Sequence, residues 1–258
     1  MLALRIDDKA FLHLIRKWLK AGILEPDGTV IDPETGTPQG GIVSPVLANV
    51  YLHYALDLWF DRVVKPHCKG EAMLCRYADD WVCAFRYKGD AERFYAVLPK
   101  RLQKFNLRVE PSKTQMLRFS RFHPGMERRF SFLGFEFFWF LDRKGTPRVK
   151  RRTARKKFRA ALNRMKEWIR LNRHKKTRWF LTALNTKLQG HYQYYGVHGN
   201  SKALWGFYET VKTYCFTWLN RRSQRKSYCW AAFHRLLSYL PLAKPRITEL
   251  KRLHRAAC

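Results

Sequence analysis

The sequence predicts an α+β fold that is followed by an all-α bundle of basic helices. Two observations carry this prediction. In the first part of the chain, segments of helical and of strand periodicity alternate, as in helices packed on an antiparallel sheet. Residues 1–145 contain 23 Lys and Arg and 17 Asp and Glu, whereas residues 146–258 contain 28 and 3. We therefore expect two domains, residues 1–145 and 146–258, with the boundary near the turn Lys144–Pro147.

Two helices are expected within the first 58 residues, with a loop between them. Apolar residues recur at helical spacing over Asp8–Ala21. The Gly-, Pro- and Asp-rich segment Glu25–Gly41 then predicts a loop or an irregular hairpin. A second helix is expected from Ser44, which can act as its N-cap, and Pro45 suits the first helical position.

A hairpin follows in residues 72–86, where the strands "AMLCRY" and "WVCAF" flank a turn at Ala78–Asp80. Helical spacing returns over residues 90–106. Two further strands are predicted at "TQMLRF" (114–119) and "FSFLGFEFFWF" (130–140). Helical spacing takes over from Arg148, and three helices are expected in 155–171, 178–196 and 201–223, which indicates a small bundle.

The net charge of +31 indicates a polyanionic partner, with nucleic acid ahead of an acidic membrane surface. The six cysteines form no C-x-x-C pair and no zinc-like pairing with histidine, so no zinc site or disulfide framework is expected. The N-terminus does not resemble a signal peptide, and the longest apolar run is too short to span a membrane. We therefore expect a soluble, cytoplasmic protein that associates with nucleic acid and not with membranes.

Two adjacent acids, Asp79 and Asp80, are expected at the tip of the hairpin. Asp is common in ordinary turns, so a purely structural role remains open. The strands on either side are apolar enough to be largely buried, and neighbouring carboxylates there would repel each other unless cations neutralised them. Mg²⁺, which binds one or two carboxylates together with water and substrate phosphates, suits such a pair.

The second candidate site is "GTPQGGIVSPVLANVYL", Gly36–Leu52. Its glycines allow a ligand to approach the backbone, and the helix from Ser44 directs its free amides back towards the loop. The segment suits a phosphate or a sugar. A Gly-rich connector before a well-capped helix is the alternative interpretation.

Together, "GTPQGG…SP.LAN.YL" and "YADD" resemble the fourth and fifth blocks of reverse transcriptases, in the form typical of bacterial group II intron reverse transcriptases, or maturases. The resemblance continues through "LRVEPSKTQ", "FSFLGFEF" and "LNTKLQGHYQYYG", and so covers essentially the whole chain. It implies a partial palm domain followed by a thumb. It also implies RNA-directed DNA polymerase activity in a mobile element that depends on RNA splicing.

The resemblance also implies roles for individual residues. Asp79 and Asp80 would be two of three carboxylates that bind two Mg²⁺ ions, and Lys113 would lie near the leaving pyrophosphate. Phe132, Leu133 and Gly134 would form the primer grip. The nucleotide and template pocket would include Pro38, Gln39, Gly40, Gly41, Tyr77 and Ala78. The partners implied are the intron RNA template, a DNA primer and a dNTP.

The basic segment Arg148–Arg159 holds eight cations in twelve positions. Because few acids balance them, phosphate binding is favoured over a solvated helix face. The expected RNA-binding residues are Arg148, Lys150, Arg151, Arg152, Arg155, Lys156, Lys157 and Arg159. Interleaved aromatic residues suit either base stacking or a bundle core.

One departure from the family pattern affects activity. The third carboxylate belongs to a block upstream of "GTPQGG", and no early acid lies on a convincing strand, so the chain resembles the C-terminal part of a longer protein. We expect it to be inactive alone and to need an N-terminal fragment that carries the missing carboxylate. A non-catalytic RNA-binding splicing module and an inactive gene relic remain the alternatives.

Overall fold

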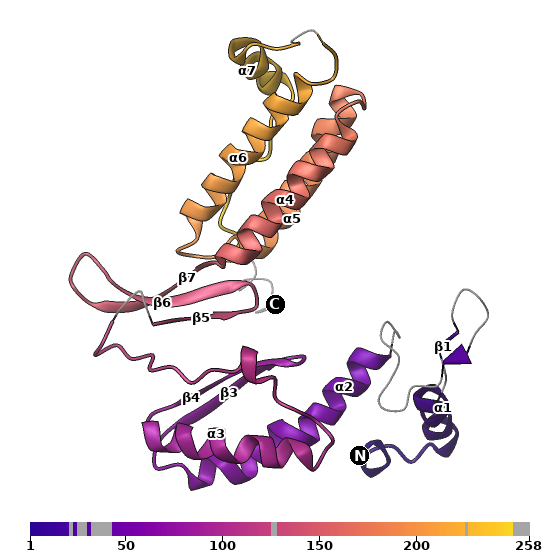
Figure 1. Cartoon of the computed structure of the whole chain (residues 1–258), viewed down its shortest axis with the longest axis vertical. Helices are drawn as coiled ribbons and strands as arrows, with labels where there is room; N and C mark the ends of the chain where they lie inside the picture. The colour runs from indigo at the N-terminus through magenta and orange to yellow at the C-terminus, as the bar shows by residue number, and fades with distance from the viewer. Residues whose placement is uncertain (21–22, 25–29, 32–42, 125–127, 225–226, 250–258) are drawn as a thin grey trace. The chain divides into compact units, whose positions relative to one another are not determined.

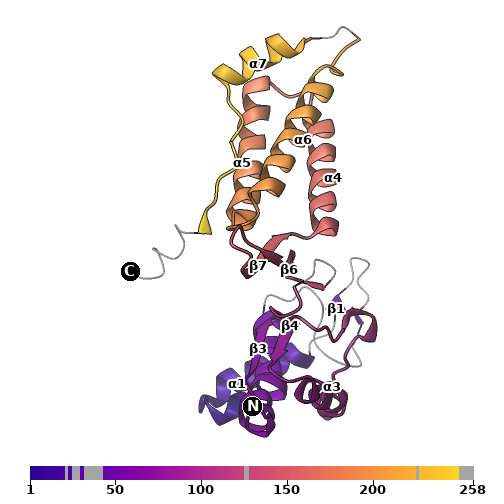
Figure 2. The same ribbon diagram turned by 90° about the vertical axis from the view of Figure 1, so that its left-hand side faces the viewer.

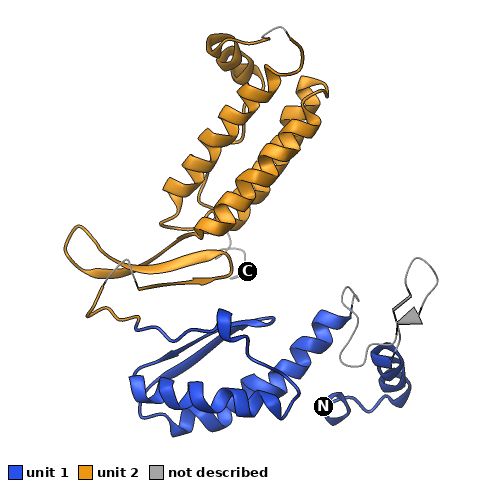
Figure 3. Cartoon of the chain, in the orientation of Figure 1, with its two compact units in different colours: residues 1–118 blue, residues 119–258 orange. Residues whose placement is uncertain are grey.

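The computed structural model describes residues 1–20, 23–24, 30–31, 43–124, 128–224 and 227–249. Helices and antiparallel strands are mixed in it, as the sequence predicts (Figures 1 and 2). The chain divides into two compact units, residues 1–118 and 119–258 (Figure 3). This division lies earlier than the change in composition near residue 145. That change falls between two paired strands of the second unit, β6 (Phe135–Leu141) and β7 (Pro147–Thr153).

The described part of the first unit contains the predicted hairpin and three α-helices. Strand β3 (Ala72–Tyr77) pairs antiparallel with β4 (Asp80–Phe85). The segment Thr114–Phe119 is not a strand, so that prediction is wrong. The other elements of the unit are η1 (Leu2–Leu4), α1 (Lys9–Lys20), β1 (Ile23–Leu24) paired with β2 (Val30–Ile31), α2 (Ser44–Leu52), α3 (Lys88–Gln103) and η5 (Pro111–Lys113).

Helix α2 is the first part of a longer helical segment. Ser44 is its first residue and Val43 its N-cap, so the expected cap lies one residue too late. The segment then widens into the π-helical turns η2 (His53–Asp57) and η3 (Phe60–Val64) and ends in the 3₁₀ turn η4 (Lys65–His67). π-Helical turns are rare and are often found at functional sites.

The core of the first unit lies between this helical segment, α3 and one face of the hairpin. Its fully or nearly buried residues are Leu56, Phe60, Phe94, Leu98 and Leu102, and Trp81 and Phe85 of β4 pack on Phe94. Burying a Leu or Phe side chain stabilises a fold by about 1.5–3 kcal/mol. This core therefore fixes the hairpin against the helices.

The second unit begins with a three-stranded antiparallel sheet in the order β5-β6-β7. The apolar run 130–140, predicted as one strand, is divided by a turn at Leu133–Gly134 into β5 (Arg129–Phe132) and β6. Strand β7 occupies Pro147–Thr153, where helical spacing was expected, and the first helix begins only at Arg155. The predictions of a single strand over residues 130–140 and of helical structure from Arg148 are therefore wrong.

A bundle of helices completes the second unit: α4 (Arg155–Asn172), α5 (Thr177–Tyr195), α6 (Ser201–Leu219) and α7 (Trp230–Tyr239). The first three are as predicted and lie side by side (Figure 2), whereas the sequence did not predict α7. Their buried faces form the larger core, which includes Leu184, Leu188, Phe207 and Phe233. Within the described part of the chain, no helix is both long enough and apolar enough to cross a membrane.

Candidate active site

The two acids lie at the tip of the β3–β4 hairpin. Tyr77 pairs with Asp80 as the last rung of the ladder, and Ala78 and Asp79 connect the strands. Ala78 has φ +52°, a left-handed conformation that costs a non-glycine residue about 1 kcal/mol. Tyr77, Ala78, Asp79 and Asp80 are all exposed. The hairpin therefore presents both carboxylates to the solvent.

The two faces of the hairpin differ in environment. Side chains alternate along β3, and Ala72, Leu74 and Arg76 point towards the helices, where they are half-buried. Met73 and Tyr77 point the other way and are 62% and 66% exposed. The expectation that these apolar strands are largely buried is thus wrong for one face of the hairpin in this chain.

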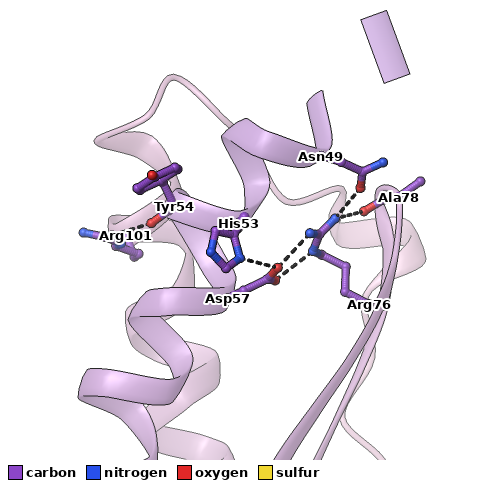
Figure 4. Close-up of polar contacts among 7 residues, drawn as sticks. All are labelled: Asn49, His53, Tyr54, Asp57, Arg76, Ala78 and Arg101. Atoms are coloured by element: carbon purple, nitrogen blue, oxygen red, sulfur yellow. Dashed lines mark hydrogen bonds and ion pairs between the residues drawn. The ribbon is translucent and has the colours of Figure 1, made fainter. Parts of the chain in front are cut away.

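Arg76 connects the acidic turn to the helical segment (Figure 4). Its Nε donates to Oδ1 of Asp57 and its Nη2 to Oδ2 of Asp57, each at 2.7 Å. Its Nη1 donates to Oδ1 of Asn49 at 2.8 Å and to the carbonyl oxygen of Ala78 at 2.9 Å. Four acceptors thus surround one guanidinium. We call Asn49, Asp57, Arg76 and the Ala78 carbonyl the Arg76 network.

The π-helical turn explains why Asn49 and Asp57 face the same guanidinium. In a regular α-helix, residues eight apart are offset by about 80° around the axis. The wider turn of η2 advances less per residue and reduces this offset. Arg101 of α3 supports the widened turn, since it donates to the carbonyl oxygens of Ala55 at 3.0 Å and Tyr54 at 3.3 Å.

The charges of the network are balanced within it. Burial opposes ionisation of Asp57, but the hydrogen bonds and charge of Arg76, with a smaller effect of His53, outweigh it and lower the pKa of the carboxyl below its ordinary value. The side chains of Arg76 and Asp57 are 12% and 24% exposed. The pair is therefore well shielded from water, and Arg76 is not free to neutralise Asp79 or Asp80.

In the described part of the chain, no Lys, Arg or His forms an ion pair with Asp79 or Asp80. Their oxygens thus remain available to a cation. Two adjacent exposed carboxylates fit an open Mg²⁺ site, in which water and substrate phosphates complete the ligands. The described residues form no cluster of three or more metal-binding side chains, so a third acidic ligand is not part of this arrangement.

The other residues expected at the active site are only partly described. Lys113 is exposed at the end of η5, and among the described residues no hydrogen bond or ion pair joins it to the acidic turn. Pro38, Gln39, Gly40 and Gly41 lie outside the described residues. Of the expected nucleotide and template residues, the structure brings Tyr77 and Ala78 together with the acids.

The residues expected to grip a primer form a tight turn in the second unit. Phe132 ends β5, and Leu133 and Gly134 follow with φ of +49° and +76°. Positive φ at both central residues is the pattern of a type I′ hairpin turn. The hydroxyl of Tyr194 donates to the carbonyl oxygen of Leu133 at 2.9 Å, and a Cβ at Gly134 would lie 3.0 Å from the hydroxyl oxygen of Tyr195.

The basic segment Arg148–Arg159 divides into two groups. The four cations of β7 contact groups of the protein itself: Arg148 pairs with Asp142, Arg151 with Glu249 and Arg152 with Glu136, and the ammonium of Lys150 lies 3.4 Å from the centre of the Phe140 ring. The other four lie in the first turns of α4 and are exposed: Arg155, Lys156, Lys157 and Arg159. These four have no ion pair within the described residues.

The aromatic residues of the bundle also fall into two groups, buried and exposed. Tyr192 is buried in the core, whereas Trp179, Tyr194 and Trp205 are 45–50% exposed. Only the exposed rings are accessible to stack on bases.

Sequence reasoning missed Arg76, Asn49 and Asp57, and it considered Tyr194 only for base stacking or the bundle core, not as a hydrogen-bond donor to the turn at Leu133. A signal for Arg76 was present, because the alternation of β3 places it on the same face as Ala72 and Leu74. A cation on the buried face of a strand needs an acidic partner. No comparable signal pointed to Tyr194, since its spacing also suits the bundle core.

Comparison with known proteins relates residues 1–137, just over half of the chain, to the family described as "Reverse transcriptase (RNA-dependent DNA polymerase)". The group II intron-encoded protein LtrA of Lactococcus lactis subsp. cremoris is 51% identical over 68 residues, which cover 24% of this chain and 11% of LtrA. A 91 kDa protein in the cob intron of Schizosaccharomyces pombe is 53% identical over 53 residues, 20% of this chain and 6% of that protein. YkfC of Escherichia coli is 32% identical over 103 residues, 30% of this chain and 27% of YkfC. The matched segments thus span a small part of each relative.

Proposed function

This chain belongs to the reverse transcriptase (RNA-dependent DNA polymerase) family, and we propose that it forms part of the palm and the thumb of a group II intron reverse transcriptase with a maturase role. The observation that carries the proposal is the exposed Asp79–Asp80 pair at a hairpin tip that Arg76 holds against α2. In this proposal the first unit contributes to the palm and the helices of the second unit form the thumb.

Asp79 and Asp80 would hold the Mg²⁺ ions of the reaction. When bound, such ions lower the pKa of a primer 3′-hydroxyl and stabilise the leaving oxygen of an incoming nucleotide. The part of this chain is to present two unpaired carboxylates from a turn with a fixed backbone. Tyr77, next to the acids and 66% exposed, offers a ring to the nucleotide or the template.

The remaining residues of the proposed site bind nucleic acid. Pro38, Gln39, Gly40 and Gly41 would line the nucleotide and template pocket, and Lys113 would offset charge near the pyrophosphate. Phe132, Leu133 and Gly134 would contact the primer end through a turn that Tyr194 holds. The template RNA, a DNA primer and a dNTP are the proposed substrates.

Binding of intron RNA without polymerisation is the second candidate function, and the four exposed cations at the start of α4 favour it. They are concentrated in five residues, and none of them forms an ion pair within the described residues. Such a cluster suits the closely spaced phosphates of RNA. The two functions are compatible, because the acidic turn lies in the first unit and the four cations lie in the second.

Metal binding at the acidic turn tests the catalytic proposal directly. In a ¹⁵N-labelled chain titrated with Mn²⁺, we expect paramagnetic broadening of the amide resonances of Tyr77–Trp81 before those of α5 and α6. Asp79→Asn, which keeps the size of the side chain but removes its charge, should abolish the selective broadening. Equal broadening in the wild type and in this variant would show that the acids do not hold the metal.

A further inference from the structure

We propose that Arg76 is a positioning residue that fixes the acidic turn to Asn49 of α2 and Asp57 of η2. The proposal rests on the metal role assigned to Asp79 and Asp80 and adds the device that sets their geometry. A continuous series of hydrogen bonds supports it. Asn49 Nδ2 donates to the carbonyl oxygen of Pro45 at 3.0 Å, and its Oδ1 accepts from Nη1 of Arg76. The same Nη1 donates to the carbonyl oxygen of Ala78.

The shape of the guanidinium makes this contact directional. Asp57 accepts from Nε and Nη2 in a bidentate pair, which fixes the plane of the group. Once the plane is fixed, Nη1 cannot rotate, and its two N–H groups point at Asn49 and Ala78. A lysine would keep the charge but could not keep these directions.

The residue that Arg76 holds is the strained one. Ala78 has φ +52°, and it directly precedes Asp79. A residue in this conformation persists only when its surroundings enforce it. The hydrogen bond to its carbonyl oxygen supplies such a constraint, so its loss should let the turn relax and change the directions of the two carboxylates.

The position of α2 gives the network a second consequence. The helix begins three residues after Gly41, the last residue of the proposed nucleotide segment. Asn49 and Asp57 follow on the same helical segment, and Arg76 precedes the acids on β3. The Arg76 network therefore links α2, which follows the proposed nucleotide segment of residues 38–41 in the chain, to the turn that carries Asp79 and Asp80.

Amide hydrogen exchange and Mn²⁺ titration of the 258-residue chain test the proposal together. The key variant is Arg76→Lys, and Asn49→Ala is a milder one that leaves the pair with Asp57 intact. Arg93→Lys is the matched control, because Arg93 also pairs with an aspartate of the first unit, Asp90, at 2.5 Å. Urea unfolding of each variant measures any loss of global stability separately.

For Arg76→Lys we expect the amides of Tyr77–Trp81 to exchange about tenfold faster, and the Mn²⁺ dissociation constant at the turn to rise about fivefold. Asn49→Ala should shift both quantities in the same direction by about threefold. Arg93→Lys should leave both unchanged.

Variants of Arg76 and Asn49 that loosen the turn no more than Arg93→Lys does would overturn the proposal and leave Arg76 a merely structural residue. A wild-type chain whose turn resonances stay sharp with Mn²⁺ would instead refute the metal role of the acids. The exchange rates would then decide the positioning role by themselves.

Discussion

The division of the basic segment predicts which cations bind RNA. We compare two double variants that lower the net charge by the same amount. Lys156→Gln/Arg159→Gln removes two exposed cations of α4, whereas Arg148→Gln/Arg151→Gln removes two cations of β7 that pair with acids of the protein. Because the net charge is equal, long-range attraction to RNA is nearly the same in both. Any difference then reports direct contacts with phosphates.

The size of the effect follows from counterion release. Each phosphate contact with a single strand contributes about 0.7 to the slope of log affinity against log salt. Loss of two contacts should therefore reduce the slope by about 1.4 and weaken binding about tenfold at 0.15 M salt. Fluorescence anisotropy with a labelled single-stranded RNA between 50 and 300 mM salt measures both. An equal loss of slope in the β7 variant would refute the division into paired and RNA-binding cations.

Three further predictions concern the second unit. Tyr194→Phe should lower the free energy of unfolding by about 0.5–1 kcal/mol in urea denaturation, because only the hydrogen bond to the turn is lost; no change would argue against that bond. Gly134→Ala should lower the free energy of unfolding by about 2 kcal/mol, because the added Cβ is strained by the positive φ and also meets Tyr195. Gly145→Ala is the control: Gly145 has φ +73° but open space around it, so its substitution should lower the free energy of unfolding by only about 1 kcal/mol. Equal losses in the two variants would contradict the close contact with Tyr195. Burial lowers the pKa of His191 to about 4 in the folded chain, so below pH 6.5 the unfolded chain binds more protons than the folded one. The free energy of unfolding should therefore fall by about 2–3 kcal/mol from pH 7 to pH 4. His191→Phe should flatten this dependence in pH-resolved unfolding, and an unchanged slope would rule out His191 as its source.

Local sequence pattern predicted α1 and the hairpin of β3 and β4. α1 has apolar residues at helical spacing, and the hairpin has two short apolar runs on either side of a polar turn. The acidic pair was found for the same reason, because two carboxylates between apolar strands stand out in a basic chain.

The missed elements lack such contrast. The turn at Leu133–Gly134 lies within an apolar run, and its only signal is Gly134, an isolated glycine of the kind that also occurs inside strands. In β7, cations such as Arg152 are matched by acids distant in sequence, for example Glu136, and local spacing cannot show such pairs. The Arg76 network is also long-range. It depends on a π-helical turn that lets Asn49 and Asp57 face the same guanidinium, and no sequence pattern indicated that turn.

RNA-templated primer extension with Mg²⁺ tests the central claim most directly. The described residues place no third acid with Asp79 and Asp80, so we expect no product from the chain alone. Product should form when an N-terminal fragment carrying the family's upstream aspartate block is supplied, and Asp79→Ala should abolish it. Robust extension by the chain alone, or extension that survives Asp79→Ala, would contradict the account.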